Sequence, residues 1–336
     1  MIVTGAALGA LAVSGAGTPL TLGLLKRRAI LDHPNPRSSH TAPTPRGGGI
    51  AVVAALILAW VLLGAAAPAT SAGLWFALGL GAGLALVSWI DDLKSLSPGP
   101  RLLAQVIAVG ATLQAFGPDE LVFQGLLPLA VDRLITGLLW LWFINLFNFM
   151  DGIDGLAGAE TVAIGLGVLT VALIGQEAGE LGPFGLVLAA AMLGFLPLNW
   201  QPAKIFLGDV GSVPLGFFAG WLLLMLAAHG QWAAALTLPA YYLADASTTL
   251  GLRISQGKPF WRAHREHAYQ RAVQLGRSHA AVSASVGLVN LALIGLAAAS
   301  LSPGAARWAS LAGAAVLTLA FLWYLRRPTT RPIHGT

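Results

Sequence analysis

The sequence contains no cysteine and few charged residues, and both absences exclude classes of protein. Without cysteine there is no disulfide, no thiol nucleophile and no zinc site built on thiolates. Charged residues make up 10% of the chain, whereas soluble domains carry about 25%. Hydrophobic residues make up 56% of the 336 residues, and the mean hydropathy is +0.75. A soluble core cannot hide that much apolar surface but a bilayer can, so the sequence predicts an all-α polytopic membrane protein.

Long apolar runs recur along the whole chain. A transmembrane helix needs about 20 apolar residues, and the sequence predicts about eleven such helices, or ten if two neighbouring runs merge. The first run carries its positive charge after the apolar residues, which is the reverse of a signal peptide and predicts a periplasmic N-terminus. The predicted spans are residues 2–25, 48–67, 73–90, 102–117, 131–147, 158–175, 182–199, 211–228, 232–250, 281–300 and 307–325.

Positive charge is distributed unevenly among the predicted loops. With a periplasmic N-terminus, all but two of the 19 Lys and Arg residues fall on the cytoplasmic side, the exceptions being Arg133 and Arg307. This asymmetry follows the positive-inside rule, and it predicts a bacterial inner-membrane protein with a cytoplasmic C-terminus. It also accounts for the net charge of +5 without nucleic acid as a partner. One membrane domain is predicted for residues 1–336, with cytoplasmic active-site loops near 26–48, 91–101, 148–158, 200–211 and 251–280.

A pair of adjacent carboxylates, Asp91 and Asp92, stands at a predicted membrane boundary, and Lys94 and Arg101 follow. Carboxylates at such a boundary need water, a cationic partner or a bound cation. One interpretation is a catalytic pair. The other is a solvated helix end in which Lys94 is the ionic partner.

The end of the run 131–147 is unusually polar. Asn145 and Asn148 lie one helical turn apart, and Asp151 and Asp154 follow, each succeeded by a glycine. Glycine accepts a positive φ, so both Asp-Gly steps are predicted to turn the chain. Amide and carboxylate oxygens beside accessible N–H groups suit a hydrated Mg²⁺ and a phosphate. A simple polar turn between two spans needs fewer such residues.

A single carboxylate, Asp209, stands between glycines just before the run 211–228. Ser212 is predicted to cap the helix that begins here, and the N-terminus of that helix favours an anion. The alternative is that the segment is only a helix cap.

The longest predicted cytoplasmic loop carries His264, Arg265 and His267. The two histidines are three residues apart, so on a helix they share a face and can bind a metal or a diphosphate. The alternative is an amphipathic helix that lies on anionic lipid headgroups. Arg46, followed by three glycines that include Gly48, is a smaller candidate for an anion site, and a flexible loop is its alternative.

All of these clusters fall at span ends on the predicted cytoplasmic side. Carboxylates, amides, histidines and arginines in one place suit Mg²⁺ with a diphosphate better than proton relay or ion conduction. Transporter carboxylates tend to lie near the middle of the membrane, and here Asp245 is the nearest example. A transporter of an anionic substrate is therefore the less favoured alternative.

The order of these motifs resembles that of the polyprenyl-phosphate N-acetylhexosamine-1-phosphate transferases, the glycosyltransferase family 4 of bacterial membranes. The resemblance implies transfer of a sugar 1-phosphate from a UDP-sugar to undecaprenyl phosphate with release of UMP. It implies Mg²⁺ as the cofactor, with Asp209 and Asn148 as metal ligands. The catalytic residues that it implies are Asp91, Asp92, Asp151, Asp154, His264 and His267, and the substrate-binding residues are Asn145, Asn148, Arg46, Gly48, Arg101 and Arg265.

The last large loop distinguishes two branches of this family. The phospho-N-acetylmuramoyl-pentapeptide transferase of peptidoglycan synthesis carries a run of consecutive histidines there, whereas this chain has His264-Arg-Glu-His267. The chain therefore resembles the branch that starts O-antigen and other surface polysaccharides, and the peptidoglycan reaction stays the alternative. The expected partners are a UDP-N-acetylhexosamine, undecaprenyl phosphate, the lipid bilayer and, as an open prediction, a second copy in a homodimer. The sequence leaves the amino sugar open.

Overall fold

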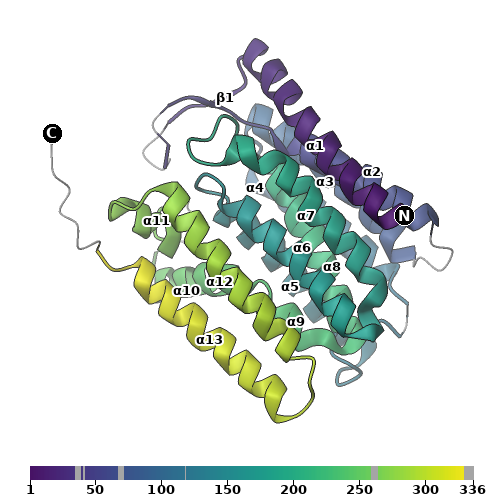
Figure 1. Ribbon diagram of the computed structural model, residues 1–336. Coiled ribbons are helices and arrows are strands. Elements are labelled where there is room, and N and C mark those ends of the chain that lie inside the picture. Colours follow the sequence, from purple (N-terminus) through teal and green to yellow (C-terminus); the bar gives the residue numbers. More distant parts are fainter. Residues whose placement is uncertain (35–38, 41, 67–71, 118, 259–263, 329–336) are drawn as a thin grey trace.

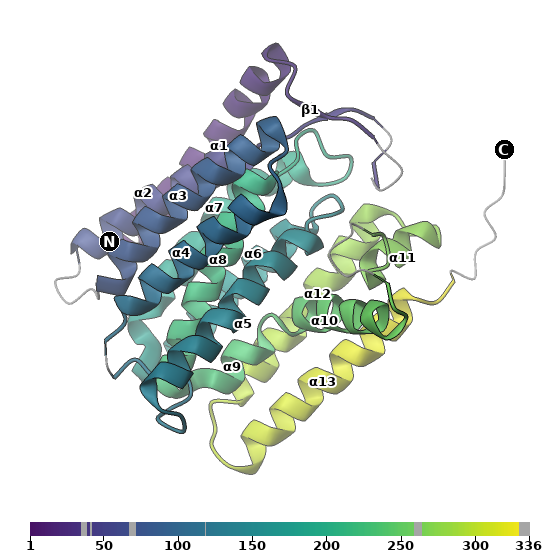
Figure 2. The ribbon, with the colours of Figure 1, turned by 180° about the vertical axis from the view of Figure 1, so that it is seen from behind.

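The computed structural model describes residues 1–34, 39–40, 42–66, 72–117, 119–258 and 264–328. Most of its helices run side by side in one bundle (Figures 1 and 2). A 3-10 segment, η1 (Gln176–Leu181), precedes α7, and a π-helical segment, η2 (Ala227–Gln231), joins α8 to α9. The helices are α1 (Ile2–Arg27), α2 (Gly49–Ala66), α3 (Ala72–Lys94), α4 (Pro98–Gln114), α5 (Leu129–Met150), α6 (Leu156–Ile174), α7 (Gly182–Asn199), α8 (Asp209–Leu226), α9 (Trp232–Thr237), α10 (Ala240–Ser255), α11 (Ala268–Gln274), α12 (His279–Ala299) and α13 (Ala305–Leu325).

Each of the eleven predicted spans overlaps a helix, which confirms the all-α membrane class. Within the described residues, nine helical segments are long and apolar enough to cross a membrane. α4, with 17 residues, is not one of these nine. The predicted span 232–250 is divided into α9 and α10 by Leu238 and Pro239. Proline lacks a backbone N–H and crowds the preceding turn, so the prediction of one continuous helix there was wrong. The number and direction of the membrane crossings stay predictions.

α8 is the central helix of the bundle. Nearly all of its residues are buried, and it packs against α2, α3, α5 and α9. In its first turn Gly211 touches Gly49 at the start of α2, where a Cβ on either residue would overlap the backbone of the other. This close approach needs glycine on both sides. It brings the residues that precede α2 against the N-terminus of α8.

A small sheet covers this end of the bundle (Figure 1). β1 (Leu31–Asp32) pairs antiparallel with β2 (Thr44–Pro45), and Arg46 then forms a parallel bridge with Phe206. The N–H of Phe206 donates to the carbonyl of Pro45 at 2.8 Å. The chain between α1 and α2 is thereby joined to the chain that leads into α8.

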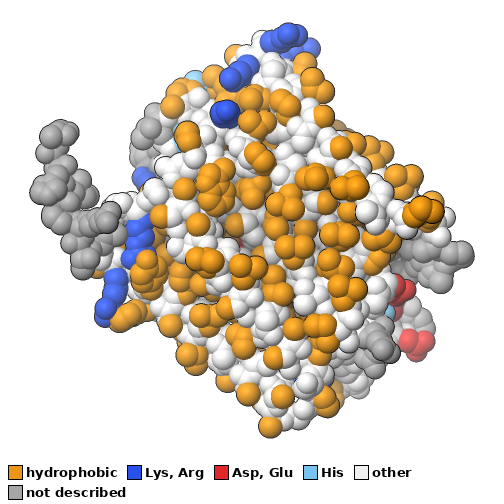
Figure 3. Space-filling view, viewed as in Figure 1, with side chains coloured by type: hydrophobic (Ala, Val, Ile, Leu, Met, Phe, Trp, Pro, Cys, Tyr) orange, Lys and Arg blue, Asp and Glu red, His pale blue; other side chains and the backbone are white. Residues whose placement is uncertain are grey.

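The surface is divided by polarity (Figure 3). Hydrophobic side chains cover the visible face, Lys and Arg gather where α1 ends and near the C-terminal end of α13, and acidic side chains lie at the opposite end of the bundle. Large apolar residues such as Leu58, Leu288 and Trp323 are more than half exposed on separate helices. Apolar sides with charged ends suit a bilayer.

Candidate active site

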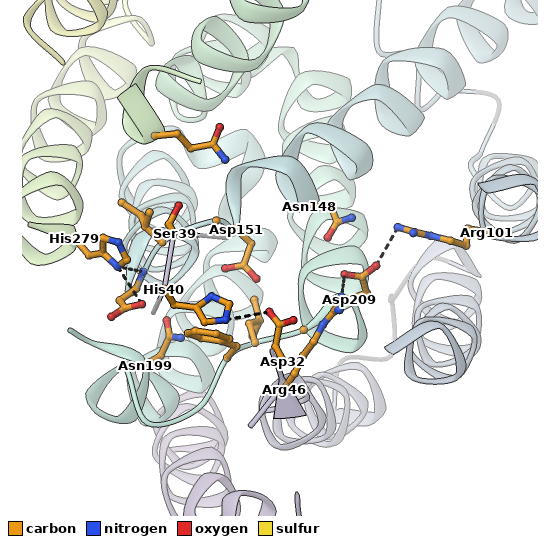
Figure 4. Close-up of a pocket in the computed structure, with 17 residues that line it drawn as sticks. Asp32, Ser39, His40, Arg46, Arg101, Asn148, Asp151, Asn199, Asp209 and His279 are labelled. Carbon is orange, nitrogen blue, oxygen red and sulfur yellow. Dashed lines mark hydrogen bonds and ion pairs between the residues drawn. The ribbon is translucent and has the colours of Figure 1, made fainter. Parts of the chain in front are cut away.

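A cavity of about 880 Å³ lies at the end of the bundle that carries the small sheet (Figure 4). Its walls come from the segment between α1 and α2, the end of α5 and the chain after it, the end of α7, and the starts of α4, α8, α11 and α12. The predicted site residues that line it are Arg46, Arg101, Asn148, Asp151, Asp154 and Asp209.

The buried carboxylate of Asp92 caps the helix that carries Asp209. Its Oδ1 accepts the N–H of Asp209 at 3.0 Å, and its Oδ2 accepts the N–H of Val210 at 2.9 Å. The first N–H groups of a helix have no partner within the helix, so a carboxylate there stabilises the helix start. Gly208 has a φ of +75°, and a Cβ on it would lie 2.8 Å from Asp92. The glycine before Asp209 is therefore needed both for its backbone conformation and for space.

Two arginines hold the carboxylate of Asp209 (Figure 4). Arg46 Nη2 lies 2.7 Å from Asp209 Oδ1, and Arg101 Nη2 lies 3.0 Å from Oδ2. Each arginine also binds one of the paired aspartates, Arg46 to Asp92 at 2.8 Å and Arg101 to Asp91 at 3.0 Å. Burial alone lowers the pKa of Arg46, but the charges of Asp209 and Asp92 outweigh it and raise the pKa overall. The five side chains therefore form one row of alternating charge, in the order Asp91, Arg101, Asp209, Arg46 and Asp92.

The two adjacent aspartates have separate partners. Asp91 Oδ1 accepts the N–H of Leu96 at 2.7 Å, while its Oδ2 binds Arg101. Neither Asp91 nor Asp92 is among the described lining residues of the cavity. In this structure they hold the arginines and the start of α8, and their direct contact with a lipid phosphate stays a prediction.

Asp151 and Asp154 occupy the turn between α5 and α6. Asp151 faces the cavity, and its burial together with the charge of Asp209 raises its pKa to about 7. Asp154 Oδ2 accepts the N–H of Ala203 at 3.0 Å, and its Oδ1 lies 3.2 Å from Nδ1 of His279. Asp154 therefore fixes the wall of the cavity, while Asp151 presents a carboxyl group to its interior.

Only one of the two Asp-Gly steps uses the conformational freedom of glycine. Gly155 has a φ of +76°, as predicted. Gly152 is not among the positive-φ residues in the described part of the chain, so that half of the prediction was wrong. Gly152 is needed for space instead, because a Cβ there would overlap the hydroxyl group of Tyr269.

The two asparagines of α5 differ in position. Asn148 lines the cavity and accepts a hydrogen bond from Ser212 Oγ at 2.6 Å. Asn145 is not in the described lining and donates to Gln105 Oε1 at 2.7 Å, which joins α5 to α4. The prediction that Ser212 caps α8 was wrong: the helix begins at Asp209, so Ser212 lies inside its first turn.

The histidine motif lies outside the described lining of the cavity. α11 begins one residue after His267, so His267 is its N-cap and His264 precedes the helix. The prediction that both share a helical face was therefore wrong, although their rings lie 4.8 Å apart. Burial and the neighbouring His267 lower the pKa of His264 to about 4. Arg265 is not a lining residue either, whereas Gln270 is. Residues 259–263 of this loop lie outside the described part of the chain.

Gly48 has a packing role in the structure. Its N–H donates to the carbonyl of Phe206 at 2.8 Å, and a Cβ on it would clash with the ring of Phe195. Gly48 is not among the described lining residues, so its predicted contact with substrate stays a prediction.

Further residues of the cavity were not predicted from the sequence. Asn199 ends α7 and accepts the N–H of Gly155 at 3.1 Å. Its signal was an amide at the end of an apolar run, the same signal that identified Asn148. His40 packs edge-on against Phe206, with ring centroids 4.8 Å apart. No sequence motif marks the segment that carries His40, because this segment reaches the cavity only through the pairing of β1 with β2. The residues missed are Asp32, Ser39, His40, Asn199, Gln270 and His279.

Comparison with known proteins identifies the family. The family model described as Glycosyl transferase family 4 matches residues 74–227. The chain is also 32% identical over 279 residues to the phospho-N-acetylmuramoyl-pentapeptide-transferase of Pseudarthrobacter chlorophenolicus, and the match covers 64% of this chain and 74% of that protein. The chain belongs to glycosyl transferase family 4. The matched residues of this glycosyl transferase include the Asp91–Asp92 pair and Asp209, and they end before the histidine motif.

Two relatives match more of the chain at lower identity. The decaprenyl-phosphate N-acetylglucosaminephosphotransferase of Mycobacterium leprae is 28% identical, over 76% of this chain and 73% of that protein. The probable undecaprenyl-phosphate N-acetylglucosaminyl 1-phosphate transferase of Bacillus subtilis is 28% identical, over 78% of this chain and 75% of that protein. Similarity of this extent reaches beyond the segment matched by the family model.

The cavity of this glycosyl transferase fits a divalent cation that is shared with a substrate. Among the described residues, no group of three or more His, Asp or Glu could hold a metal by itself. Mg²⁺ commonly takes one or two protein carboxylates and fills its other positions with water and substrate phosphates. Asp209 and Asn148 offer a carboxylate and an amide oxygen to the cavity, and Asp151 adds a second carboxyl group, whose pKa is raised by burial first and by the charge of Asp209 second. These donors suit a cation that arrives with a phosphorylated substrate.

Proposed function

We propose that this protein transfers an N-acetylhexosamine 1-phosphate from a UDP-sugar to undecaprenyl phosphate and releases UMP. The observation that supports this best is Asp209, held between Arg46 and Arg101 in a cavity that also contains Asn148 and Asp151. Arginine suits phosphate, and carboxylate and amide oxygens suit Mg²⁺. The names of the Mycobacterium leprae and Bacillus subtilis relatives support a polyprenyl-phosphate acceptor.

In the proposed reaction, an oxygen of the lipid phosphate attacks the β-phosphorus of the UDP-sugar in line with the leaving group. A P–O bond forms to the lipid phosphate, the bond from the β-phosphorus to the bridging oxygen breaks, and UMP leaves with that oxygen. Charge on the phosphoryl oxygens dominates such a transfer, so positioned cationic groups supply most of the catalysis. Arg46 and Arg101 would bind those oxygens from opposite sides of Asp209.

Asp209 and Asn148 would hold Mg²⁺, which would neutralise charge on the diphosphate. Asp92 would keep both Arg46 and the first turn of α8 in place, and Asp91 would do the same for Arg101. A phosphomonoester has a second pKa of about 6, so a general base would contribute little to its attack. His264, His267 and Arg265, just before α11, would contact the sugar or the diphosphate.

The proposed location is the bacterial inner membrane, with the cavity on the cytoplasmic side. Lys26 and Arg27 end α1, only a few residues before Asp32 in the cavity wall. The positive-inside rule favours the cytoplasm for this end of the bundle. A cytoplasmic cavity has access to nucleotide sugars, while α-helices below it contact lipid.

The donor is an N-acetylhexosamine in the favoured proposal, and the lipid-linked product starts a surface polysaccharide such as O-antigen. The interrupted histidine motif, His264-Arg-Glu-His267, supports this branch. A second candidate is the peptidoglycan reaction, favoured by the 32% identity to the Pseudarthrobacter chlorophenolicus enzyme. The two candidates share the acceptor and differ in the sugar donor.

A donor panel separates these candidates. Membranes that contain the protein would be given undecaprenyl phosphate, Mg²⁺ and, one at a time, UDP-N-acetylglucosamine, other UDP-N-acetylhexosamines and UDP-N-acetylmuramoyl-pentapeptide. We expect UMP and a lipid-linked sugar with one N-acetylhexosamine donor, and neither product without the lipid phosphate. Product from the pentapeptide donor alone would establish the second candidate. Absence of UMP with every donor would contradict the proposal.

A further inference from the structure

α11 is held by a buried aspartate that lies outside the described lining of the cavity. Asp245 of α10 is fully buried, and its Oδ1 accepts the N–H of Ala268 at 2.7 Å. Its Oδ2 accepts the N–H of Tyr269 and the hydroxyl proton of Tyr241, both at 3.3 Å. A buried carboxylate with several donors is fixed firmly in place. Asp245 thereby fixes the start of α11 and the direction in which Tyr269 points.

Tyr269 reaches from α11 to the turn that carries Asp151. It is fully buried, and its hydroxyl donates to the carbonyl oxygen of Phe149 at 2.9 Å. That carbonyl lies in the last turn of α5, where carbonyl groups have no partner within the helix. Burial raises the pKa of Tyr269 well above its usual value, so the hydroxyl keeps its proton and stays a donor. Gly152, directly after Asp151, packs against the same hydroxyl.

We infer that Tyr269 is a positioning residue for nucleotide binding: its hydroxyl, bonded to Phe149 and packed on Gly152, fixes the turn that presents Asp151 to the cavity. This inference rests on the proposed function for the chemistry of the ligand, a uridine diphosphate group. Tyr269 is not among the described lining residues, so it acts through the turn, whereas its neighbour Gln270 lines the cavity directly.

The contact between Tyr269 and Gly152 can be tested with two substitutions, one that adds a methyl group at Gly152 and one that removes the hydroxyl group of Tyr269. Gly152 lacks a positive φ, so alanine suits the backbone there. A Cβ on Gly152 would overlap the hydroxyl oxygen of Tyr269 but would lie 3.0 Å from its ring carbon Cζ. Tyr269→Phe removes that oxygen and therefore makes most of the room that Gly152→Ala needs. The effects of the two substitutions should then be strongly non-additive, as for residues in direct contact.

The experiment measures UDP affinity in the presence of Mg²⁺ by calorimetry, together with thermal unfolding, on the full-length protein in detergent. Tyr269→Phe should weaken UDP binding about five- to tenfold, the scale of one hydrogen bond. Its unfolding temperature should fall by only about 2–4 °C, the scale of one buried hydrogen bond, and its KM for undecaprenyl phosphate should stay at the wild-type value. Gly152→Ala should weaken UDP binding further, and the double variant should return to the affinity of Tyr269→Phe alone. Tyr324→Phe, on the exposed side of α13, is the matched control and should change nothing.

The outcomes separate this inference from the proposed function. Unchanged UDP affinity in Tyr269→Phe would overturn the inference and leave the proposed function intact. A large fall in the unfolding temperature of Tyr269→Phe, together with weaker binding of both UDP and undecaprenyl phosphate, would also overturn it. That result would make Tyr269 a general structural residue. A double variant no better than Gly152→Ala would overturn the proposed contact. A wild-type protein that does not bind UDP would contradict the proposed function and the inference together.

Discussion

The side chain of Asp92 and the backbone of Asp209 form one unit, because Asp92 Oδ1 accepts the Asp209 N–H at 3.0 Å. Arg46 joins them a second time by binding both carboxylates, at 2.8 Å and 2.7 Å. A change at Asp92 therefore alters where the Asp209 carboxylate lies. The Asp-Asp motif is connected to the cavity through this helix start and through the two arginines, rather than by lining the cavity itself.

This relationship predicts the behaviour of Asp92→Asn. The amide keeps the size of the side chain but cannot accept both N–H groups and Arg46, so buried donors lose partners at a cost of about 1–3 kcal/mol. We expect a lower unfolding temperature and at least a tenfold loss of kcat, measured as UMP release. A residue that only positions its neighbours transfers no proton, so on this account the activity that remains should keep the wild-type pH dependence.

The control for Asp92→Asn is Asp119→Asn, an exposed aspartate in the loop after α4. This control should leave activity and unfolding temperature unchanged. A normal unfolding temperature in Asp92→Asn, combined with the loss of one limb of the pH profile, would contradict the positioning role and support acid–base catalysis.

The pKa of Asp151 predicts a pH dependence of nucleotide binding. Burial and the charge of Asp209 raise this pKa to about 7, so the carboxyl group is neutral at lower pH and gains its charge as the pH rises through that value. A cation at the site stabilises the charged form. The affinity for UDP with Mg²⁺ should therefore fall about tenfold from about pH 8 to about pH 6.

Asp151→Asn isolates this effect. The amide does not titrate, so by calorimetry the variant should bind UDP weakly at every pH in this range and keep only the shallow slope that titration of the terminal phosphate of UDP produces. If the variant kept the wild-type slope, the titration would belong to another group.

The contrast between predicted and observed positions has a physical cause. The helices followed from apolar length alone, because a bilayer requires nearly every backbone group to be bonded within its own helix. The sequence also shows Pro239, but the length of the apolar run 232–250 favoured one continuous helix over a helix broken at this proline. Asp91 and Asp92 were found because carboxylates are costly at a membrane boundary. The pairing of Asp92 with Arg46 and Asp209 was not predicted, because these residues are distant in sequence and meet only when α2, α3 and α8 pack together.

Local rules also failed where a tertiary contact supplied the reason for a residue. Ser212 fits the pattern of an N-cap, but Asp92 from another helix takes that role. Gly152 fits the pattern of a turn glycine, yet its glycine is required by Tyr269, which lies more than a hundred residues away. A single sequence carries no direct signal for such pairs.

The pairing of Asp209 with both arginines predicts that Mg²⁺ and UDP strengthen each other's binding. Both oxygens of Asp209 are engaged by Arg46 and Arg101, so Mg²⁺ alone should bind weakly. A bound diphosphate would compete for the arginines and would release the carboxylate of Asp209. Saturating UDP should strengthen Mg²⁺ binding by about tenfold or more, and Mg²⁺ should strengthen UDP binding by the same factor.

Arg101→Gln should separate the two ligands in this coupling. With one arginine removed, Mg²⁺ alone should bind more tightly than to the wild type, whereas UDP should bind more weakly. Calorimetric titrations of each ligand, alone and with the other, measure both effects. Independent binding of Mg²⁺ and UDP to the wild-type protein would contradict the exchange of partners.

The absence of cysteine makes the predicted topology directly testable. Lys94→Cys places a thiol at the exposed end of α3 on the predicted cytoplasmic side, and Asp119→Cys places one on the predicted periplasmic side. A membrane-impermeant maleimide added to intact cells should label only the second variant, and disruption of the membrane should allow labelling of the first. The reverse pattern would invert the bundle and place the cavity on the periplasmic side.

The central claim is that the cavity around Asp209 transfers a sugar phosphate to a lipid phosphate. Its most direct test compares wild-type protein with Asp209→Asn in the transfer assay, with undecaprenyl phosphate, Mg²⁺ and the donor selected from the panel. The wild type should release UMP and form lipid-linked sugar in equal amounts, and excess chelator should stop both. Asp209→Asn should fold and insert normally yet lose at least about a hundredfold in rate, because it lacks the carboxylate that binds both arginines and that is proposed to bind Mg²⁺. Near-normal turnover by Asp209→Asn would contradict the account.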